Sequence, residues 1–238
     1  MLLIDGDIFC YRVACVCETS AQAIRGFNGL ISDVLLGFPD HDYVLYITGG
    51  NNFRHDVATT APYKGNRKDT PKPEFLPDVR QHAIEYWGAV LVEGEEADDA
   101  IAIAASTHYL NHDPIMVSID KDFDQIAGMH YNFVKRDLYF ITSETGLKNF
   151  YKQILTGDTI DNIIGVDGIG AGAAQDLIGG CRKETDMWDI CEDQLGYDRA
   201  LENARLLWLR RTEGQMWMPP RERTAGERFY GEATSATH

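Results

Sequence analysis

The chain has 238 residues, of which 44% are hydrophobic and 25% are charged, a composition that predicts a folded globular protein and excludes a disordered chain. Its formal net charge of −15 argues at first sight against nucleic acid as a partner. No apolar run is long enough to span a membrane, and the first residues, MLLIDGD, lack the features of a signal peptide, so we expect a cytoplasmic protein.

Strand-like and helix-like segments alternate over the first 146 residues. Short apolar runs rich in β-formers predict strands at 1–5, 42–48, 89–94, 114–120, 131–137 and 138–142. Helical spacing predicts helices at 11–38, with an interruption near Gly26 and Gly29, at 73–88, and at 96–106. This alternation predicts an α/β fold with a parallel central sheet.

Acidic residues stand where predicted strands end or where the next helix begins, at Asp5, Glu96, Asp98, Asp99, Asp120 and Asp122. The carboxyl ends of parallel strands share one edge of a sheet, where ligands bind, so we expect these side chains to converge. Five acids within residues 93–99 repel one another more than helix capping requires, which indicates a bound cation. Each acid alone could be a cap or a solvated loop residue, but the shared edge favours a Mg²⁺ or Mn²⁺ centre.

The segment YKGNRKDTPK (63–72) is a local basic patch in this acidic chain. It holds four basic residues and one acid, a local charge of +3, so the rest of the chain carries −18. A basic patch beside an acidic pocket is what a metal-dependent phosphodiesterase needs. The total charge therefore does not exclude a nucleic acid as the partner.

A glycine-rich stretch, GVDGIGAGAA (165–174), separates two predicted helices soon after Asp158 and Asp161. Gly168 and Gly170 would let backbone N–H groups approach a phosphate, as in helix–hairpin–helix DNA binding, whereas a simple turn is the alternative. The pattern is helical and glycine-rich from about residue 147. It predicts a second module at 147–214 and a poorly ordered tail at 215–238.

Seven blocks, in order, resemble the flap-endonuclease and 5′→3′ exonuclease superfamily, particularly small phage exonucleases and the 5′-nuclease domain of bacterial DNA polymerase I. The blocks are LLIDGD, FCYR, NNFRHD, YKGNRK, EADD, SIDKDFDQI and GDTIDNIIGVDGIG, and they cover residues 1–180. The resemblance implies a PIN-like α/β core at 1–146, with helices on both faces of the sheet and an arch segment at about 50–85. It also implies that the module at 147–214 is a helix–three-turn–helix (H3TH) unit.

The resemblance further implies two divalent ions, Mg²⁺ or Mn²⁺, and allows K⁺ at the H3TH module. One divalent ion would be held mainly by Asp5, Glu96 and Asp98, and the second by Asp99, Asp120, Asp122, Asp158 and Asp161. Lys64 and Arg67 would act on the scissile phosphate together with the catalytic carboxylates Asp5 and Asp120. The implied DNA-binding residues are Tyr11, Arg54, Lys64, Arg67, Lys68, Gly168 and Gly170, although Tyr11 could equally be a core residue.

One position departs from the family pattern. The family has a metal-binding Asp just after the second strand, where this chain has Thr48 and Gly49, and Asp56 is the next acid along the chain. Loss of one outer ligand weakens the prediction for the first metal, but it leaves the eight other matched carboxylates in place.

The implied function is metal-dependent hydrolysis of DNA phosphodiester bonds at or near 5′ ends, by a 5′→3′ exonuclease, a flap endonuclease or both. The expected partner is duplex DNA with a 5′ end, a gap or a flap, and an RNA–DNA hybrid and the oligomeric state stay open; a phage-encoded protein would act in the host cytoplasm. One alternative is a haloacid-dehalogenase-type phosphatase, because LLIDGD supplies an Asp-x-Asp after a strand, although Phe9 stands where that family needs Thr or Val. The other alternative is a non-catalytic protein that binds DNA structures, which the Thr48 departure suggests.

Overall fold

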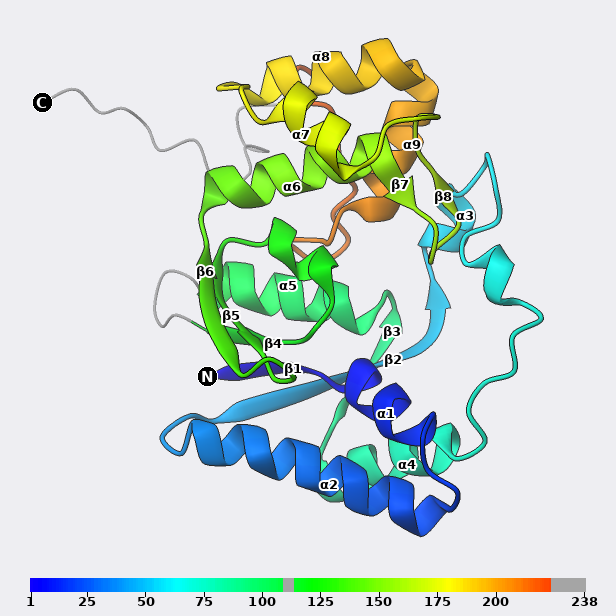
Figure 1. Cartoon of the computed structure of the whole chain (residues 1–238), viewed down its shortest axis with the longest axis vertical. Helices are drawn as coiled ribbons and strands as arrows, with labels where there is room; N and C mark the ends of the chain where they lie inside the picture. The colour runs from blue at the N-terminus through cyan, green and yellow to red at the C-terminus, as the bar shows by residue number, and fades with distance from the viewer. Residues whose placement is uncertain (109–113, 224–238) are drawn as a thin grey trace, which may run out of the picture.

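The computed structural model describes residues 1–108 and 114–223 (Figure 1). Its main sheet has six strands in the order β3-β2-β1-β4-β5-β6. The strands are β1 (Leu2–Asp5), β2 (Tyr43–Asn52), β3 (Val90–Gly94), β4 (Ile115–Val117), β5 (Gly128–Asn132) and β6 (Asp137–Ile141). Neighbouring strands from β3 to β5 are parallel, and β6 is antiparallel to β5. The predicted parallel sheet is confirmed, with an antiparallel strand at one edge.

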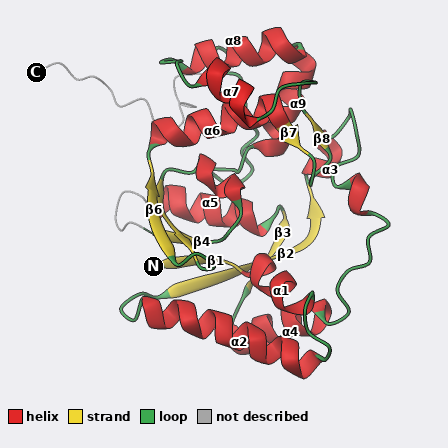
Figure 2. Cartoon of the chain, viewed as in Figure 1, coloured by secondary structure: helices red, strands yellow, loops and turns green. Residues whose placement is uncertain are grey.

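Helices cover both faces of this sheet (Figure 2). They are α1 (Gly6–Ala14), α2 (Ser20–Gly37) and α4 (Leu76–Trp87) on one face and α5 (Ala97–His108) on the other. Side chains alternate along β1: Leu2 and Ile4 join the core under the first three helices, and Leu3 joins a second core with Ile101 of α5. Burial on both faces explains why the strand is apolar up to its last residue, Asp5. Within the described residues, no helix combines the length and the apolar character needed to cross a bilayer.

The predicted helix at 11–38 is two helices, and its break is not at the glycines. The chain turns between α1 and α2, where the Thr19 side chain accepts a hydrogen bond from the Gln22 N–H at 3.2 Å and caps α2. Gly26 lies within α2, and a Cβ there would approach Val13 of α1 to 3.3 Å. This glycine therefore allows close packing of the two helices.

A helical second module follows β6. It contains α6 (Ser143–Thr156), β7 (Gly157–Asp158), β8 (Ile163–Ile164), α7 (Ala171–Ile178), α8 (Glu184–Leu195) and α9 (Tyr197–Leu207). The module begins at Ser143, four residues before the predicted start at 147. Its own core includes Trp188, and Tyr63 from the arch segment also packs there.

The first part of the predicted tail, residues 215–223, is ordered, contrary to the prediction. Trp217 is 1% exposed within the core of the second module, and Arg223 pairs with Glu184 of α8 at 2.7 Å. Burial of a tryptophan side chain is a large apolar contribution that holds this segment. The rest of the predicted tail, 224–238, lies outside the described residues.

Candidate active site

Two acids at adjacent strand ends share one serine. Asp5 ends β1, is 4% exposed, and accepts hydrogen bonds from the Ile8 N–H at 3.2 Å and from the Ser118 hydroxyl at 2.7 Å. Asp120 follows β4; its N–H donates to the same hydroxyl at 3.1 Å, and its carboxylate accepts from the Asp122 N–H at 2.9 Å. The predicted meeting of these strand ends is confirmed. The sequence patterns did not indicate Ser118, which binds the Asp5 side chain and the Asp120 backbone.

The electrostatics show that further acids lie close to this pair. Burial, with the charges of Asp7 and Asp120, raises the pKa of Asp5 to about 7. Burial and the charges of Asp5, Glu96 and Asp120 raise the pKa of Asp98 well above its usual range. Within the described residues, Asp98 makes no hydrogen bond or ion pair. A carboxylate that is crowded by other acids and left without a donor is suited to a cation.

A similar group of acidic side chains surrounds the short helix η2 (Lys121–Gln125). Burial and the charges of Asp120 and Asp158 raise the pKa of Asp122 to about 7, although Gln153 of α6 donates to its carboxylate at 2.6 Å. The Lys121 ammonium nitrogen lies 3.3 Å from a carboxylate oxygen of Asp158. In 1–108 and 114–223, no three His, Cys, Asp or Glu side chains form a ready-made metal cluster. The carboxylates nevertheless form an all-oxygen donor set, which fits Mg²⁺ or Mn²⁺ better than softer metals.

These raised pKa values make the metal-free protein sensitive to pH. Between about pH 4 and pH 7 the folded state keeps protons that the unfolded chain has lost, so the free energy of unfolding falls as pH rises through this range. Asp98→Asn removes part of the repulsion. We expect the variant to be more stable than the wild type in EDTA at pH 8, with a smaller difference at pH 5, as measured by urea unfolding.

Asp33→Asn, at an exposed position of α2, is the matched control and should leave the free energy of unfolding unchanged at both pH 8 and pH 5. An Asp98→Asn variant that is less stable than the wild type at pH 8 would contradict this description of the acids.

The basic segment is docked onto the acids. The Tyr63 hydroxyl donates to Glu96 at 2.9 Å and to Asp161 at 2.8 Å, while the Lys64 ammonium group pairs with Glu96 and lies 3.8 Å from Asp161. Arg67, in the short helix η1 (Gly65–Arg67), donates to Asp161 at 2.8 Å. The backbone of Lys64 is left-handed, with φ of 54°, so the chain turns sharply where its side chain enters the site. Cations from the basic segment at 63–72 therefore lie on carboxylates from the residue before α5, Glu96, and from the loop after β7, Asp161.

Two predicted roles are wrong, because Asp99 and Arg54 form a buried ion pair. Asp99 is 0% exposed and Arg54, in α3 (Arg54–Val57), is 1% exposed. Their side chains make two hydrogen bonds, at 2.5 and 2.9 Å, and Arg54 also donates to the carbonyl oxygens of Leu206 and Trp208. Arg54 cannot reach a DNA phosphate from this position. Because successive helical residues point about 100° apart, Asp98 faces the other acids while Asp99 turns inward and is not a metal ligand.

Thr48 and Gly49, which the resemblance matches to the family's acid, lie inside β2 rather than after it. The Thr48 hydroxyl accepts a hydrogen bond from the Ala97 N–H at 2.9 Å, and a side chain at Gly49 would collide with the Glu93 carboxylate. Asp56 is exposed on α3. Instead, Asp7 accepts a hydrogen bond from the Thr48 N–H at 2.9 Å. Sequence analysis missed Asp7, although it is the second acid of the LLIDGD block.

The remaining predicted residues lie on accessible surfaces. Tyr11 is 39% exposed on α1, which argues against a place in the core, and Lys68 is exposed. Gly168 has φ of 79°, and Gly170 precedes α7, with open space around both Cα atoms. These positions are open to a partner, and their predicted roles in DNA binding stay predictions.

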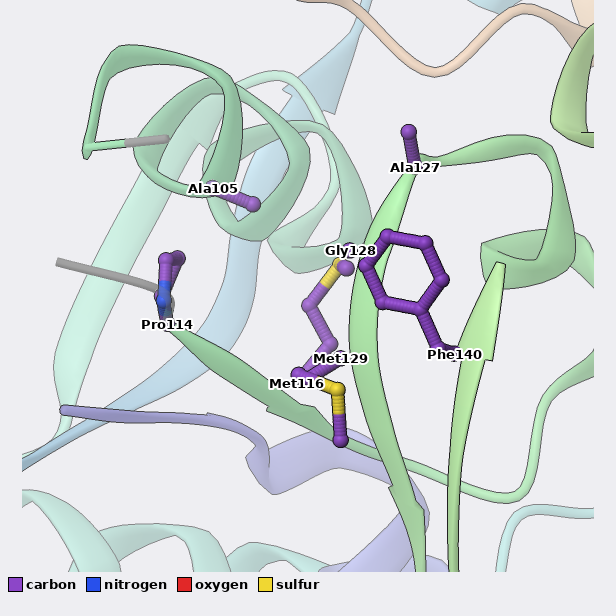
Figure 3. Close-up of a pocket in the computed structure, with 7 residues that line it drawn as sticks. All are labelled: Ala105, Pro114, Met116, Ala127, Gly128, Met129 and Phe140. Atoms are coloured by element: carbon purple, nitrogen blue, oxygen red, sulfur yellow. The ribbon is translucent and has the colours of Figure 1, made fainter. Parts of the chain in front are cut away.

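A small apolar pocket lies elsewhere, between α5 and strands β4 to β6 (Figure 3). It is lined by Ala105, Pro114, Met116, Ala127, Gly128, Met129 and Phe140. None of these side chains carries a charge or an acid–base group. The pocket is therefore part of the packing of the sheet, and the chemistry belongs to the acidic edge.

Residues 1–153 match the family model described as "5'-3' exonuclease, N-terminal resolvase-like domain". The chain belongs to this family. It is 30% identical over 203 residues to DNA polymerase I of Bacillus caldotenax, covering 75% of this chain and 23% of that protein. It is also 30% identical over 180 residues to the flap endonuclease Xni of Shewanella piezotolerans, covering 70% of this chain and 69% of that protein. The chain thus spans about a quarter of the length of the DNA polymerase I relatives.

Solved structures of other proteins have the same fold as this chain. The crystal structure of the bacteriophage T5 D15 protein co-crystallized with metal ions has a TM-score of 0.70 at 19% identity, covering 87% of this chain and 88% of that one. Human GEN1 in complex with Holliday junction DNA has a TM-score of 0.52 at 17% identity, covering 79% of this chain and 51% of that one. The expected PIN-like core is confirmed by the T5 match together with the family model.

Proposed function

We propose that this protein is a metal-dependent 5′ nuclease that hydrolyses DNA phosphodiester bonds at or near 5′ ends, as an exonuclease, a flap endonuclease or both. The observation that carries the proposal is the contact between two oppositely charged groups: the carboxylates at the carboxyl edge of the sheet, and Lys64 and Arg67 of the arch segment. Phosphodiester hydrolysis needs oxygen ligands for a cation and positive side chains for the phosphate. Membership of the 5′-3′ exonuclease family supports the same chemistry.

The proposed ligands of Mg²⁺ or Mn²⁺ fall into two groups, Asp5, Glu96 and Asp98, and Asp120, Asp122, Asp158 and Asp161. When bound, such ions activate water and neutralise charge that develops on the phosphate. The Ser118 hydroxyl donates to the Asp5 carboxylate and accepts from the Asp120 backbone N–H, so it fixes the Asp5 side chain and the Asp120 backbone before substrate arrives. The T5 D15 protein was co-crystallized with metal ions, and its shared fold supports a divalent metal in this chain.

Lys64 and Arg67 would change partners during the reaction. Both now contact carboxylates, and arrival of a phosphate and cations at the edge would offer them a new anion while their present partners bind metal. Lys64 and Arg67 would then neutralise the scissile phosphate. The Tyr63 side chain, buried in the core of the second module, would keep this segment in place during the exchange.

The second module would act as an H3TH unit that holds the duplex beyond the cut. Gly168 and Gly170 present unobstructed backbone just before α7, and backbone N–H groups at a helix N-terminus bind phosphate without reading bases. K⁺ at this hairpin is part of the proposal. The core at 1–146 would carry out catalysis, and the module at 147–214 would set the position of the cut.

Cleavage of end-labelled DNA tests the function. Duplex, gapped and flapped substrates labelled at the 5′ or 3′ end should be cut only with Mg²⁺ or Mn²⁺, and the first products should come from the 5′ end or the base of a flap. Turnover of a small phosphomonoester without DNA cleavage would favour the phosphatase alternative. Metal-independent binding of branched DNA without any nick would favour the non-catalytic one.

A four-bond contact ties the arch segment to the second module. The Glu202 carboxylate in α9 accepts hydrogen bonds from the N–H and hydroxyl groups of Thr59 and Thr60, at 2.6 to 2.9 Å. Glu202→Ala leaves these donors without their partner, so the free energy of unfolding should fall by about 1–3 kcal/mol. Urea denaturation measures this loss, and limited proteolysis should cut the arch segment sooner.

Asp193→Ala on the exposed face of α8 is the control for the loss of one acid from the same module. If Glu202→Ala matches the wild type in both denaturation and proteolysis, the contact does not hold the arch segment.

A further inference from the structure

Arg80 joins three elements beside Thr48 of β2. It lies in α4, and its two terminal nitrogens, Nη1 and Nη2, donate to the Asp7 carboxylate and to the Thr48 carbonyl oxygen. Asp7, in the first turn of α1, also accepts the hydrogen bond from the Thr48 N–H at 2.9 Å. The guanidinium group therefore has a defined position beside Thr48, the residue that the resemblance matches to the family's acid.

The position of Arg80 relative to the acids indicates a role beyond holding α4, α1 and β2 together. Asp7 is two residues from Asp5 and close enough for its charge to raise the pKa of Asp5, so Arg80 reaches the rim of the acidic edge. Lys64 and Arg67 reach Glu96 and Asp161 from the predicted arch segment, whereas Arg80 reaches Asp7 from α4, which lies with α1 away from the second module (Figure 1). A DNA strand that follows the carboxyl edge would pass between the two sets of cations.

The Arg80 side chain has donors to spare. It is 25% exposed, and a guanidinium group carries five N–H donors. Within the described residues, Arg80 uses one donor on each of Nη1 and Nη2, for the Asp7 carboxylate and the Thr48 carbonyl. A partly exposed arginine whose terminal nitrogens are held and which has unused N–H donors is a pre-organised phosphate ligand.

We propose that Arg80 binds a DNA backbone phosphate on the α4 side of the active site, with Asp7 and the Thr48 carbonyl as the groups that aim it. This inference rests on the proposed nuclease function. It gives the site a fixed positive charge on the side where the family's acid is absent. A phosphate entering the edge is then held from both sides, by Lys64 and Arg67 on one and Arg80 on the other.

Equilibrium binding of a 5′-flap duplex by the full chain, in Ca²⁺ and between 50 and 200 mM KCl, tests this contact. Arg80→Gln should bind about tenfold more weakly at the lower salt concentration. Its plot of log affinity against log salt should be shallower by about 0.9, the value for one lost phosphate contact. Arg80→Lys keeps the charge and should restore the slope, with lower affinity because lysine lacks the planar fork.

Lys135→Gln, at the exposed turn between β5 and β6, is the control for the loss of one positive charge and should keep the wild-type slope. If Arg80→Gln lowers the melting temperature but leaves the slope unchanged, Arg80 is a structural brace and the inference is wrong. Wild-type affinity in Arg80→Gln also overturns it. A wild type that cuts DNA while Arg80→Gln behaves normally rejects only this inference, whereas a wild type that neither binds nor cuts DNA rejects the proposed function as well.

Discussion

Asp120→Ala should lower metal-dependent DNA cleavage by on the order of 10³-fold, because several kcal/mol of charge stabilisation at the phosphate depend on the cations that this edge holds. Asp120 follows β4, is held at its backbone N–H by Ser118, and adds to the repulsion at Asp5, Asp98 and Asp122. Asp120 therefore lies close to acids of both proposed groups of metal ligands. Single-turnover cleavage of a 5′-labelled flap substrate in Mg²⁺ measures the effect.

DNA binding separates loss of chemistry from loss of structure. The variant should keep most of its affinity for the same substrate in Ca²⁺, because Lys64, Arg67 and the glycine hairpin remain. Asp33→Ala, on the exposed face of α2, should cleave at the wild-type rate. Full activity in Asp120→Ala would overturn the assignment of the active site.

Arg54→Met should lower the free energy of unfolding by about 3–5 kcal/mol, the cost of leaving one member of a buried ion pair without its partner. Asp99 has no exposed surface and would be left with a buried charge facing an apolar side chain. The same substitution removes the hydrogen bonds of Arg54 to the carbonyl oxygens of Leu206 and Trp208, which tie α3 to the C-terminal end of α9 and the residue after it. Urea unfolding, monitored by tryptophan fluorescence, measures the loss.

A double variant identifies the cause. Arg54→Met with Asp99→Leu removes both charges and should recover part of the lost stability, since well-packed apolar pairs can replace buried ion pairs. Arg25→Met, at an exposed position of α2, is the control and should change stability little. A loss below about 1 kcal/mol in Arg54→Met, the range of a surface ion pair, would show that Arg54 is exposed in solution and would return it to the candidates for DNA binding.

The sequence predicted the parts of this site that depend on strand order. Apolar runs located the parallel strands, and the rule that ligands bind at their carboxyl ends placed Asp5 and Asp120 at one edge. The break between α1 and α2 was also readable, because Thr19 is a good N-cap, but the glycines gave a stronger false signal.

Long-range contacts could not be read from local patterns. The partners of Arg54 lie 45 residues away at Asp99 and more than 150 residues away at Leu206 and Trp208, so nothing near Arg54 marks it as buried. Helical spacing placed Glu96 and Asp99 on one face, but Glu96 precedes α5, and only Asp98 of the first turn faces the other acids. Trp217 packs on a core formed far from it in sequence, which made its segment look like a tail.

The most direct test of the central claim is anomalous diffraction from crystals of the protein soaked in Mn²⁺. We predict manganese peaks bounded by the carboxylates of Asp5, Asp98 and Asp120, with the Lys64 ammonium group displaced from Glu96. Crystals that diffract well and show no manganese among these side chains, with Lys64 still on Glu96, would contradict the account.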